Sequence, residues 1–424
     1  MGKIKRSIGI SAVVIVVVAA GIVALAETGG VTPLNKGSNR WIPINANLQV
    51  AAVPVSAPAA ILMDAKTGQV LYAKNIMQKH YPASLVKLMT SIIALDRVKK
   101  GTLTYHSLIP VSQNAYQVAQ TPGLSVAYLN PAENITLAKM LEYMYVVSAD
   151  DAAVAIADDI AGSESNFAIQ MNRKATQLGL TGTHYVNASG LQNAKQYTNA
   201  YDVAKLSQYL IQKFPIVLQY ASEPGMYIHP GQYGNTYDQL LGQYAGLDGL
   251  KTGSTDQAGY CFSGTAIRNG HRLISVVMDA SSFTNVFQDT KNLLNYGFQQ
   301  FKQEKIQTAG QALLTPLAVK DAQKQKISVA PKLDVWLNVP RSLGHSIFTS
   351  FIPSVTNAPI IKGQQVGMEE IGYQGHVVLT VPVYAQENDP KAGFFVKTWR
   401  VVMINAHQGA AKIVNWAIKK LAKL

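Results

Sequence analysis

Ser84 and Lys87 are the residues whose types and spacing point most directly to chemistry. They lie in the run HYPASLVKLMTSIIAL, residues 80–95, and Ser84 is the only serine that is followed by a lysine three positions later. Successive residues of a helix are rotated by about 100°, so the two side chains would lie on neighbouring positions of its first turn. A desolvated lysine amine can take the proton of a serine hydroxyl. The pair therefore predicts a serine nucleophile beside its base.

The same run also has a purely structural interpretation. Serine is a favoured N-cap residue, and the apolar residues that follow it repeat at helical spacing. On this interpretation Ser84 only begins a core helix, whose apolar face consists of Leu85, Leu88, Met89, Ile92 and Leu95. The stretch by itself favours this interpretation, so the chemical one needs support from elsewhere in the chain.

Two further motifs supply that support. The triplet SAD at residues 148–150 lies in a run that predicts a helix, and KTGS at residues 251–254 precedes a predicted strand. A second KTG begins at Lys66, upstream of Ser84, between two apolar runs that predict a β-hairpin. Gly68 suits the turn of that hairpin, so we assign this copy to turn chemistry and expect the Lys66 side chain to be solvated.

With these motifs the chain resembles the serine penicillin-recognising enzymes, most closely the low-molecular-weight penicillin-binding proteins that are D-alanyl-D-alanine carboxypeptidases. The family pattern is SxxK, then SxN, then KTG. The resemblance includes AAILMDAKTGQVLYAKN and LGLTGTHYVNASGL and covers about residues 58–397. It implies an α+β fold. A β-lactamase/transpeptidase-like domain, with a sheet flanked by helices plus a helical lobe, would be followed by a small all-β domain and a C-terminal amphipathic helix.

The resemblance implies acyl transfer at Ser84. Ser84 would attack the carbonyl between two D-alanines of a peptidoglycan stem peptide, and Lys87 would take its proton. Ser148 would relay a proton to the leaving amine, and water would then hydrolyse the acyl-enzyme. β-Lactams would acylate Ser84 by mimicking the dipeptide, so they are expected as covalent inhibitors.

The KTGS motif would hold the substrate. Lys251 and Thr252 would bind the terminal carboxylate, a role suited to an ammonium and a hydroxyl, and Gly253 completes the family motif. The backbone N–H groups of Ser84 and Ser254 would form the oxyanion hole, where each donor is worth about 3–4 kcal/mol in other acyl-transfer enzymes. Some relatives place an arginine shortly before KTG; none lies between Phe214 and Lys251 here, so carboxylate binding rests more heavily on Lys251.

Asp150 departs from the family pattern, which has asparagine at this position. Asparagine offers an N–H₂ donor to a substrate carbonyl, whereas an ionised aspartate only accepts hydrogen bonds. A carboxylate near Lys87 would also favour its charged form and oppose its use as a base. Alternatively, Asp150 is protonated or holds Lys87 in place. We therefore include Asp150 among the substrate-site residues with its role open.

Composition limits the partners and cofactors. The chain of 424 residues carries a net charge of +13, which favours an anionic partner such as nucleic acid, phospholipid or an acidic wall polymer. The single cysteine, Cys261, excludes an intrachain disulfide and lies in an apolar run typical of a buried strand. The eight histidines show no metal-ligand spacing, so no metal and no cofactor is expected.

The N-terminus predicts export. Residues 1–26 combine a basic start, an apolar run from Ile8 to Leu25 and an Ala-x-Ala sequence, which is the pattern of a secretory signal. The apolar run approaches the roughly 20 residues of a membrane span, so an uncleaved signal anchor is the alternative. Either way the protein is expected at the outer face of the bacterial cytoplasmic membrane, which argues against nucleic acid as its partner.

The rest of the chain divides by composition. Residues 27–57 read as a linker, 58–302 as the penicillin-binding domain, and 303–390, with alternating apolar and polar residues, as the small β domain. Residues 391–424 are expected to form an amphipathic segment that binds an anionic membrane surface. In its terminal run AAKIVNWAIKKLAKL, Ile413, Val414, Ala417, Ile418 and Leu421 share one helical face opposite the lysines. The alternative is a helix packed on the β domain.

The leading hypothesis is thus a membrane-attached D,D-carboxypeptidase. A β-lactamase is disfavoured because no Glu-x-x-x-Asn deacylation element lies at a convincing place and because of the additional β domain. A wall-binding homologue weakened by Asp150 and a D,D-endopeptidase that uses the same residues remain as alternatives.

Overall fold

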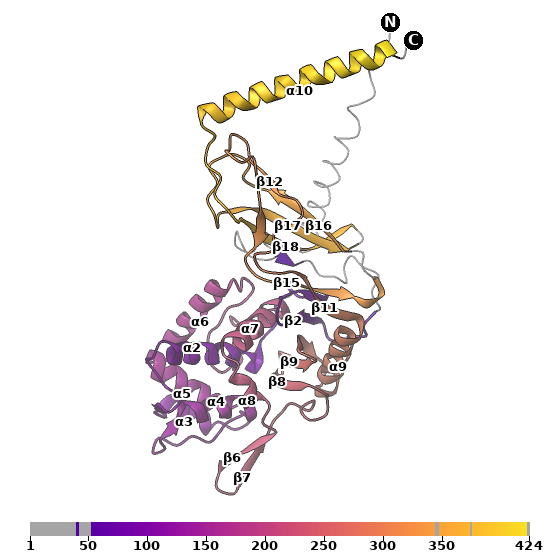
Figure 1. Ribbon diagram of the computed structural model, residues 1–424. Helices are drawn as coiled ribbons and strands as arrows, with labels where there is room; N and C mark the ends of the chain where they lie inside the picture. The colour runs from indigo at the N-terminus through magenta and orange to yellow at the C-terminus, as the bar shows by residue number, and fades with distance from the viewer. Residues whose placement is uncertain (1–39, 42–51, 344–346, 374, 422–424) are drawn as a thin grey trace. The chain divides into compact units, whose positions relative to one another are not determined.

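The computed structural model describes residues 40–41, 52–343, 347–373 and 375–421 (Figure 1). The predicted signal and most of the predicted linker lie outside these residues. The chain forms two compact units. The first contains residues 42–302 and the short segment 338–342, and the second contains most of residues 303–424.

The first unit is built on a five-stranded antiparallel sheet in the order β3-β2-β10-β9-β8. The strands are β2 (Ala59–Asp64), β3 (Val70–Lys74), β8 (Leu247–Thr255), β9 (Gly259–Arg268) and β10 (His271–Ala280). Strands from both ends of this part of the chain therefore share one sheet. The predicted β2–β3 hairpin is confirmed, with Gly68 at a φ of 77° and Lys66 exposed in its turn.

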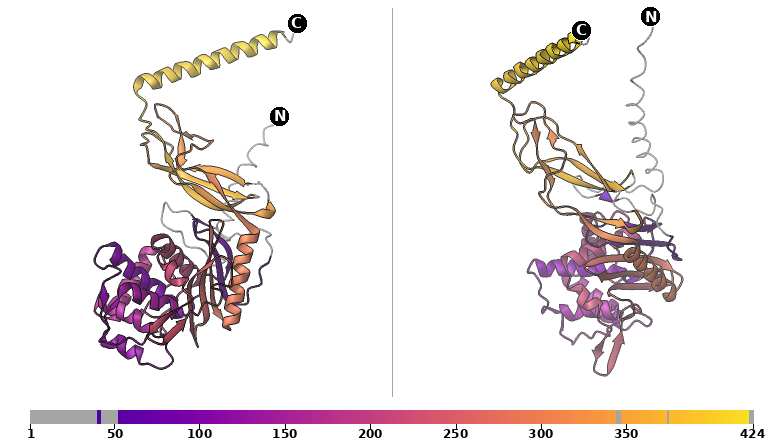
Figure 2. Two further views of the ribbon diagram at one scale, coloured as in Figure 1. Left: turned by 60° about the horizontal axis from the view of Figure 1, so that its bottom comes forward. Right: turned by 45° about the vertical axis from the view of Figure 1, so that its right-hand side comes forward.

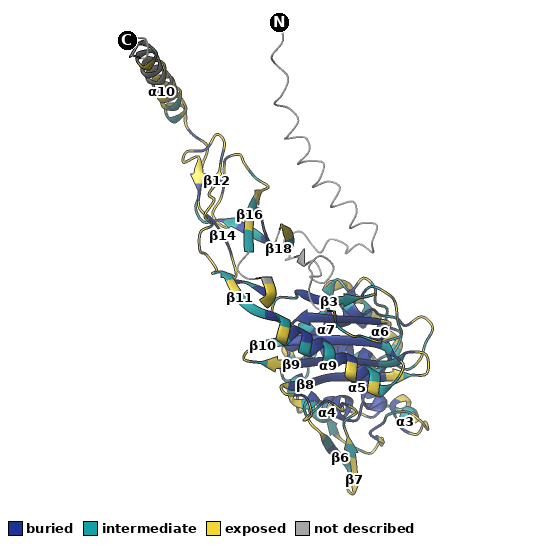
Figure 3. Cartoon of the chain, turned by 90° about the vertical axis from the view of Figure 1, so that its right-hand side faces the viewer, coloured by how far each residue is buried: buried dark blue, intermediate teal, exposed yellow. Residues whose placement is uncertain are grey.

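Helices cover both faces of this sheet. A Cβ on Gly264 of β9 would contact Thr290 of α9 (Phe283–Gln300), whereas the neighbouring Ser263 bonds to Ser207 of α7 (Ala200–Lys213) at 2.8 Å. Successive strand residues point to opposite faces, so α9 and α7 lie on opposite sides. The left view of Figure 2 shows this arrangement, and Figure 3 shows the central strands buried between the layers.

A helical lobe is inserted between β3 and β8. It contains α2 (Lys87–Lys99), α3 (Gln113–Ala119), α4 (Leu137–Val146), α5 (Asp150–Ala161), α6 (Glu164–Leu178) and the short α8 (Val217–Ala221). Two small ladders accompany the helices: β4 (Leu108–Ile109) with β5 (Ile135–Thr136), and β6 (Gly225–His229) with β7 (Gln232–Asn235). The lobe and the α7 side of the sheet share one apolar core, which includes Ile61, Leu88, Ile92 and Ile274.

Local sequence signals set the ends of these helices. The side chains of Ser112, Thr136, Ser163, Asn199 and Ser282 each accept a backbone N–H at the start of α3, α4, α6, α7 and α9. Gly162 and Gly179 end α5 and α6 at φ values of 74° and 68°. Glycine adopts this left-handed conformation without the steric cost that other residues incur, so it ends each helix at a defined residue.

The second unit is mainly β. Its larger sheet has the order β1-β18-β17-β16, with β14 paired to β18. These strands are β1 (Arg40–Trp41), β14 (Val329–Pro331), β16 (Ile347–Pro353), β17 (Gln365–Tyr373) and β18 (His376–Ala385). Two further pairs follow: β11 (Phe301–Gln307) with β15 (Val335–Pro340), and β12 (Leu317–Ala318) with β13 (Lys326–Ile327). The end of β15 and most of the short 3-10 helix η3 (Arg341–Leu343) fall in the segment 338–342 that is grouped with the first unit.

The chain continues into a long helix, α10 (Phe394–Leu421). It begins well before the terminal run in which the sequence indicated helical amphipathicity. Large apolar side chains are exposed along its first turns, among them Phe395 at 87% and Trp399 at 65%. Among the described residues, no helix has the length and apolar character needed to span a membrane.

Candidate active site

Ser84 lies in the 3-10 turn η2 (Ala83–Val86), directly before α2. It is not an N-cap, because α2 begins at Lys87 and no side chain caps the turn. The N-cap part of the structural interpretation is therefore wrong. The expected apolar face is confirmed, because all of its residues are buried in the core: Leu85, Leu88, Met89, Ile92 and Leu95. Ala83 has a φ of 47°, an uncommon value for a residue with a side chain. Strain of this kind is tolerated where the surroundings hold the backbone, and here it sets the start of the Ser84 turn.

The backbone of Ser84 is enclosed by two glycines. A Cβ on Gly253 of β8 would lie 2.9 Å from the Ser84 nitrogen. A Cβ on Gly190, which has a φ of 101°, would lie 2.0 Å from the Ala83 oxygen and 2.9 Å from the same nitrogen. Both contacts are with backbone atoms, so a larger residue would force the turn to move. The glycines let two distant segments approach the nucleophile turn.

Lys87 is almost fully buried and makes three directed contacts. Its Nζ lies 2.9 Å from the Ser84 Oγ, 2.6 Å from Asp150 Oδ1 and 2.8 Å from the Ser189 carbonyl oxygen. An ammonium has three hydrogens, so these acceptors use all of them. The predicted neighbours Ser84 and Lys87 are thus in direct contact, and Asp150 belongs to the same cluster.

Asp150 and Ser148 come from the junction between α4 and α5. Ser148 has a φ of 60° and Asp150 is the first residue of α5, with its amide bonded to the Ser125 carbonyl at 2.7 Å. Both residues are buried. The next residue, Asp151, accepts the N–H groups of Ala127 and Leu129 at 3.0 Å and anchors the adjoining loop. The helix start therefore fixes the direction of the Asp150 carboxylate toward Lys87.

The KTGS motif lies inside β8, whereas the sequence placed it before a strand. Lys251, Thr252 and Gly253 are buried in this edge strand, and Ser254 is exposed. Glycine is depleted in strands, and the two glycines of this stretch concealed its pairing with β9. The β8 strand contacts η2, so the motif lies next to the turn that carries Ser84.

Lys251 is buried, and its ammonium forms no hydrogen bond or ion pair with any residue that the structure describes. Burial and the Lys87 cation hold the pKa of Lys251 well below its ordinary value, while Asp150 and Asp238 oppose that shift. An anionic ligand at this position would favour the charged form of Lys251 and accept hydrogen bonds from its ammonium.

Asp238 is a residue that the motifs did not indicate. It is buried, and its Oδ1 accepts the Leu240 N–H at 2.9 Å. Its Oδ2 has no partner among the described residues, and burial raises its pKa to about 6 although Lys251 lowers it. No sequence pattern pointed to Asp238. Ser189 and Gly190 lie in the run LGLTGTHYVNASGL, which is part of the family resemblance, but the sequence assigned them no role because each acts through a tertiary contact.

The structure thus joins Ser84, Lys87 and Asp150 by hydrogen bonds and brings Gly253 against the Ser84 amide. Lys251 interacts electrostatically with Lys87 and Asp150. No hydrogen bond within the described residues links the side chains of Ser148, Thr252 or Ser254 to this cluster. No group of described histidine, cysteine or carboxylate side chains has the geometry of a metal site.

Comparison with known proteins decides the family. Residues 46–282 match the family model described as D-alanyl-D-alanine carboxypeptidase. The chain belongs to this family. Residues 301–391 match a second model, described as penicillin-binding protein 5, C-terminal domain. The predicted family, serine-hydrolase activity and α+β fold are confirmed, and the weakened wall-binding alternative is not favoured.

Individual relatives cover most of the chain. D-alanyl-D-alanine carboxypeptidase DacC of Escherichia coli is 31% identical over 85% of this chain and 90% of its own length. D-alanyl-D-alanine carboxypeptidase DacF of Bacillus subtilis is 29% identical over 80% of this chain and 87% of its own length. Penicillin-binding protein 5 of Haemophilus influenzae superposes with a TM-score of 0.75 at 27% identity, covering 81% of this chain and all of its own.

A relative solved with a bound ligand matches part of the chain. Penicillin-binding protein D2 of Listeria monocytogenes, solved in its ampicillin-bound form, has a TM-score of 0.53 at 34% identity. The match covers 58% of this chain and all of the Listeria chain. The family to which this chain belongs thus includes a member that binds a β-lactam.

Proposed function

We propose that this enzyme removes the terminal D-alanine from peptidoglycan stem peptides through an acyl-enzyme on Ser84. The single observation that carries the proposal is the contact of the Ser84 Oγ with a buried lysine amine, 2.9 Å away. That geometry meets the requirement for a hydroxyl nucleophile, which needs a base within hydrogen-bond reach.

The reaction proceeds in two balanced halves. The Lys87 ammonium first passes one proton to the Asp150 carboxylate, 2.6 Å away, and the amine that results takes the Ser84 hydroxyl proton as Oγ bonds to the peptide carbonyl carbon. The C–N bond then breaks, and Ser148 relays the proton from Lys87 to the departing D-alanine amine. In the second half a water molecule gives a proton to the Lys87 amine as its oxygen bonds to the acyl carbon. The bond from that carbon to the Ser84 Oγ then breaks, Lys87 gives the proton to Oγ, Asp150 returns its proton to Lys87, and the shortened peptide leaves.

The β8 strand binds the substrate in this proposal. Lys251, with its uncommitted ammonium, and Thr252 hold the terminal carboxylate. The backbone N–H groups of Ser84 and Ser254 receive the oxyanion of the tetrahedral intermediate, and Gly253 allows the strand to approach the nucleophile turn closely enough. β-Lactams acylate Ser84 by the same route.

D-Alanine release tests the activity. The full chain is incubated with a stem pentapeptide that ends in D-alanyl-D-alanine, and free D-alanine is measured. We expect release by the wild type and none above background by Ser84→Ala with an unchanged melting temperature. Equal release by both variants would refute the assignment of Ser84.

We further propose that residues 1–26 direct export and 27–57 link to a catalytic domain of residues 58–302. The β domain of residues 303–390 then carries the segment 391–424, which binds the anionic membrane surface. The exposed apolar residues Phe395, Trp399 and Val402 support the membrane contact, because their spacing places them on one face of α10. Exposed Lys412 adds a cationic contact, worth about 1 kcal/mol near an anionic leaflet.

Vesicle binding tests this membrane proposal. The chain should sediment with vesicles that contain an anionic phospholipid, less so at high salt, and the double variant W399E/I418E should lose most of that binding. Leu314, fully exposed outside the helix, provides the matched control L314E, which should bind like the wild type. Equal binding by W399E/I418E and the wild type would exclude the helix as the membrane contact.

A further inference from the structure

The Ser189 carbonyl is one of the three acceptors that orient Lys87. It belongs to the loop between α6 and α7, and its neighbour Gly190 packs against the turn that carries Ser84. Because one short backbone segment contacts both the base and the nucleophile turn, the position of this segment sets the geometry of the pair.

Two side chains from different helices hold the segment at Ala188, which is fully buried. Thr90 of α2 donates its hydroxyl to the Ala188 carbonyl at 2.6 Å. Glu164, the first residue of α6, accepts the Ala188 N–H on its Oε1 at 3.0 Å. These two hydrogen bonds fix the peptide groups on both sides of Ala188. The next carbonyl, that of Ser189, is thereby directed at Lys87.

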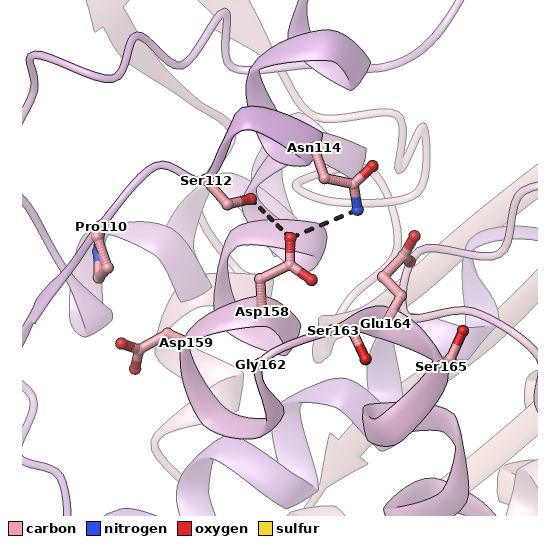
Figure 4. A pocket seen from close by; sticks show the side chains of 9 residues that line it. All are labelled: Pro110, Ser112, Asn114, Asp158, Asp159, Gly162, Ser163, Glu164 and Ser165. Atoms are coloured by element: carbon pink, nitrogen blue, oxygen red, sulfur yellow. Dashed lines mark hydrogen bonds between the residues drawn. The ribbon is translucent and has the colours of Figure 1, made fainter.

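Glu164 borders a surface pocket of about 560 Å³ on the outside of the lobe (Figure 4). A second carboxylate there, Asp158, accepts hydrogen bonds from Ser112 at 2.6 Å and Asn114 at 3.4 Å. Both carboxylates are thus engaged by protein groups. A carboxylate at a helix start is also favoured by the helix dipole. Burial raises the pKa of Glu164, while the Ala188 N–H and the nearby Asn114 side chain oppose that shift.

We propose that Glu164 is a positioning residue for the reaction: through the Ala188 N–H it holds the Ser189 carbonyl against Lys87, and so keeps the base aimed at Ser84. The inference rests on the proposed function of this pair. It predicts that Glu164 acts on the chemical step and not on binding of the substrate carboxylate, because its contact with Ala188 leads directly to Lys87. The same loop reaches β8 only further along, where Thr255 donates to Gln192 at 3.1 Å.

Three variants of the full chain test this role. Misplacement of a catalytic group by about 1 Å costs roughly a hundredfold in rate, so Glu164→Ala should lower the rate of acylation by a fluorescent penicillin about tenfold to a hundredfold. For peptide hydrolysis, kcat should fall while KM stays the same. Glu164→Gln keeps an oxygen acceptor for Ala188 and should recover most of the rate. Asp159→Ala, an exposed carboxylate lining the same pocket, should match the wild type.

The outcomes separate this inference from the proposed function. A wild-type chain that takes no penicillin would refute the proposed function, whereas normal acylation of both the wild type and E164A would refute the inference alone. E164Q falling as far as E164A would also overturn it, because the lost property would then be the charge and not the hydrogen bond. If E164A does not fold, T90V tests the same segment from α2: a lowered kcat supports the inference, and an unchanged kcat overturns it.

Discussion

Replacement of Lys87 by methionine would remove the base and leave a carboxylate without its counter-ion. In the folded protein the Lys87 and Asp150 side chains are only 1% and 8% exposed, and their charged atoms lie 2.6 Å apart. Removing one partner of a buried ion pair costs about 3–5 kcal/mol, because the remaining charge stays away from water. For a domain of this size we expect K87M to lower the melting temperature by roughly 6–20 °C.

The second variant in this experiment separates stability from chemistry. In the double variant K87M/D150N the buried carboxylate is replaced by a neutral amide, so part of the lost stability should return. We expect the double variant to be more stable than the sum of the two single effects by at least about 1 kcal/mol, within the range for residues in contact. Neither K87M nor K87M/D150N should be acylated by penicillin, since both lack the amine.

Stability is measured by denaturant unfolding of the wild type, K87M, D150N and K87M/D150N. Acylation of the same four proteins by a fluorescent penicillin measures the chemistry. If the effects of K87M and D150N on the free energy of unfolding simply add in the double variant, the two side chains do not form a stabilising ion pair. Acylation of K87M at the wild-type rate would contradict the role of Lys87 as base, whatever its effect on stability.

The remaining predictions concern the buried carboxylate Asp238 and the two KTG motifs. Burial raises the pKa of Asp238 from 3.8 to about 6, so its contribution to stability is full below pH 4 and is lost as the pH rises through 6. D238N should therefore be more stable than the wild type at pH 7.5, by up to about 3 kcal/mol, and equally stable at pH 4; a gain independent of pH in thermal unfolding would contradict this. Lys251→Gln removes the proposed partner of the substrate carboxylate and should lower kcat/KM for the stem pentapeptide about tenfold to a hundredfold, whereas Lys66→Gln should leave it unchanged. If K66Q and K251Q lower kcat/KM equally, the assignment of substrate binding to the Lys251 motif is wrong.

The Ser84–Lys87 contact could be predicted from the sequence because it is local. Three residues separate the two side chains, and the first turn of any helical structure brings such residues together. The order of the motifs then indicated the family. What the local pattern did not reveal was the 3-10 turn that replaces a capped helix start, because that turn depends on the contacts of Gly190 and Gly253 with distant segments.

The β8 strand shows a second limit. Its residues Gly249 and Gly253 weaken any strand signal, and the strand forms because β9 pairs with it along Leu250–Thr255. The strand β9 and the buried position of Cys261 in it followed from the apolar pattern and are confirmed. The periodicity of apolar residues predicts a strand well where the side chains fill a core. It fails for β8, where glycines let the backbone approach the active site closely.

Asp150 illustrates what only tertiary structure decides. From the sequence it was a departure from the family pattern with several open roles. The structure brings its carboxylate against Lys87 and supports the proposal that it exchanges a proton with that lysine. Asp238 lies in a loop with no motif, and its importance follows only from its burial beside Lys251.

The most direct test of the central claim is the intact mass of the full chain after incubation with a penicillin, followed by peptide mapping. We expect one adduct per chain, located on Ser84 and absent from the Ser84→Ala variant. A folded wild-type chain that forms no adduct, or forms one on another residue, would contradict the claim that Ser84 and Lys87 form a working nucleophile and base.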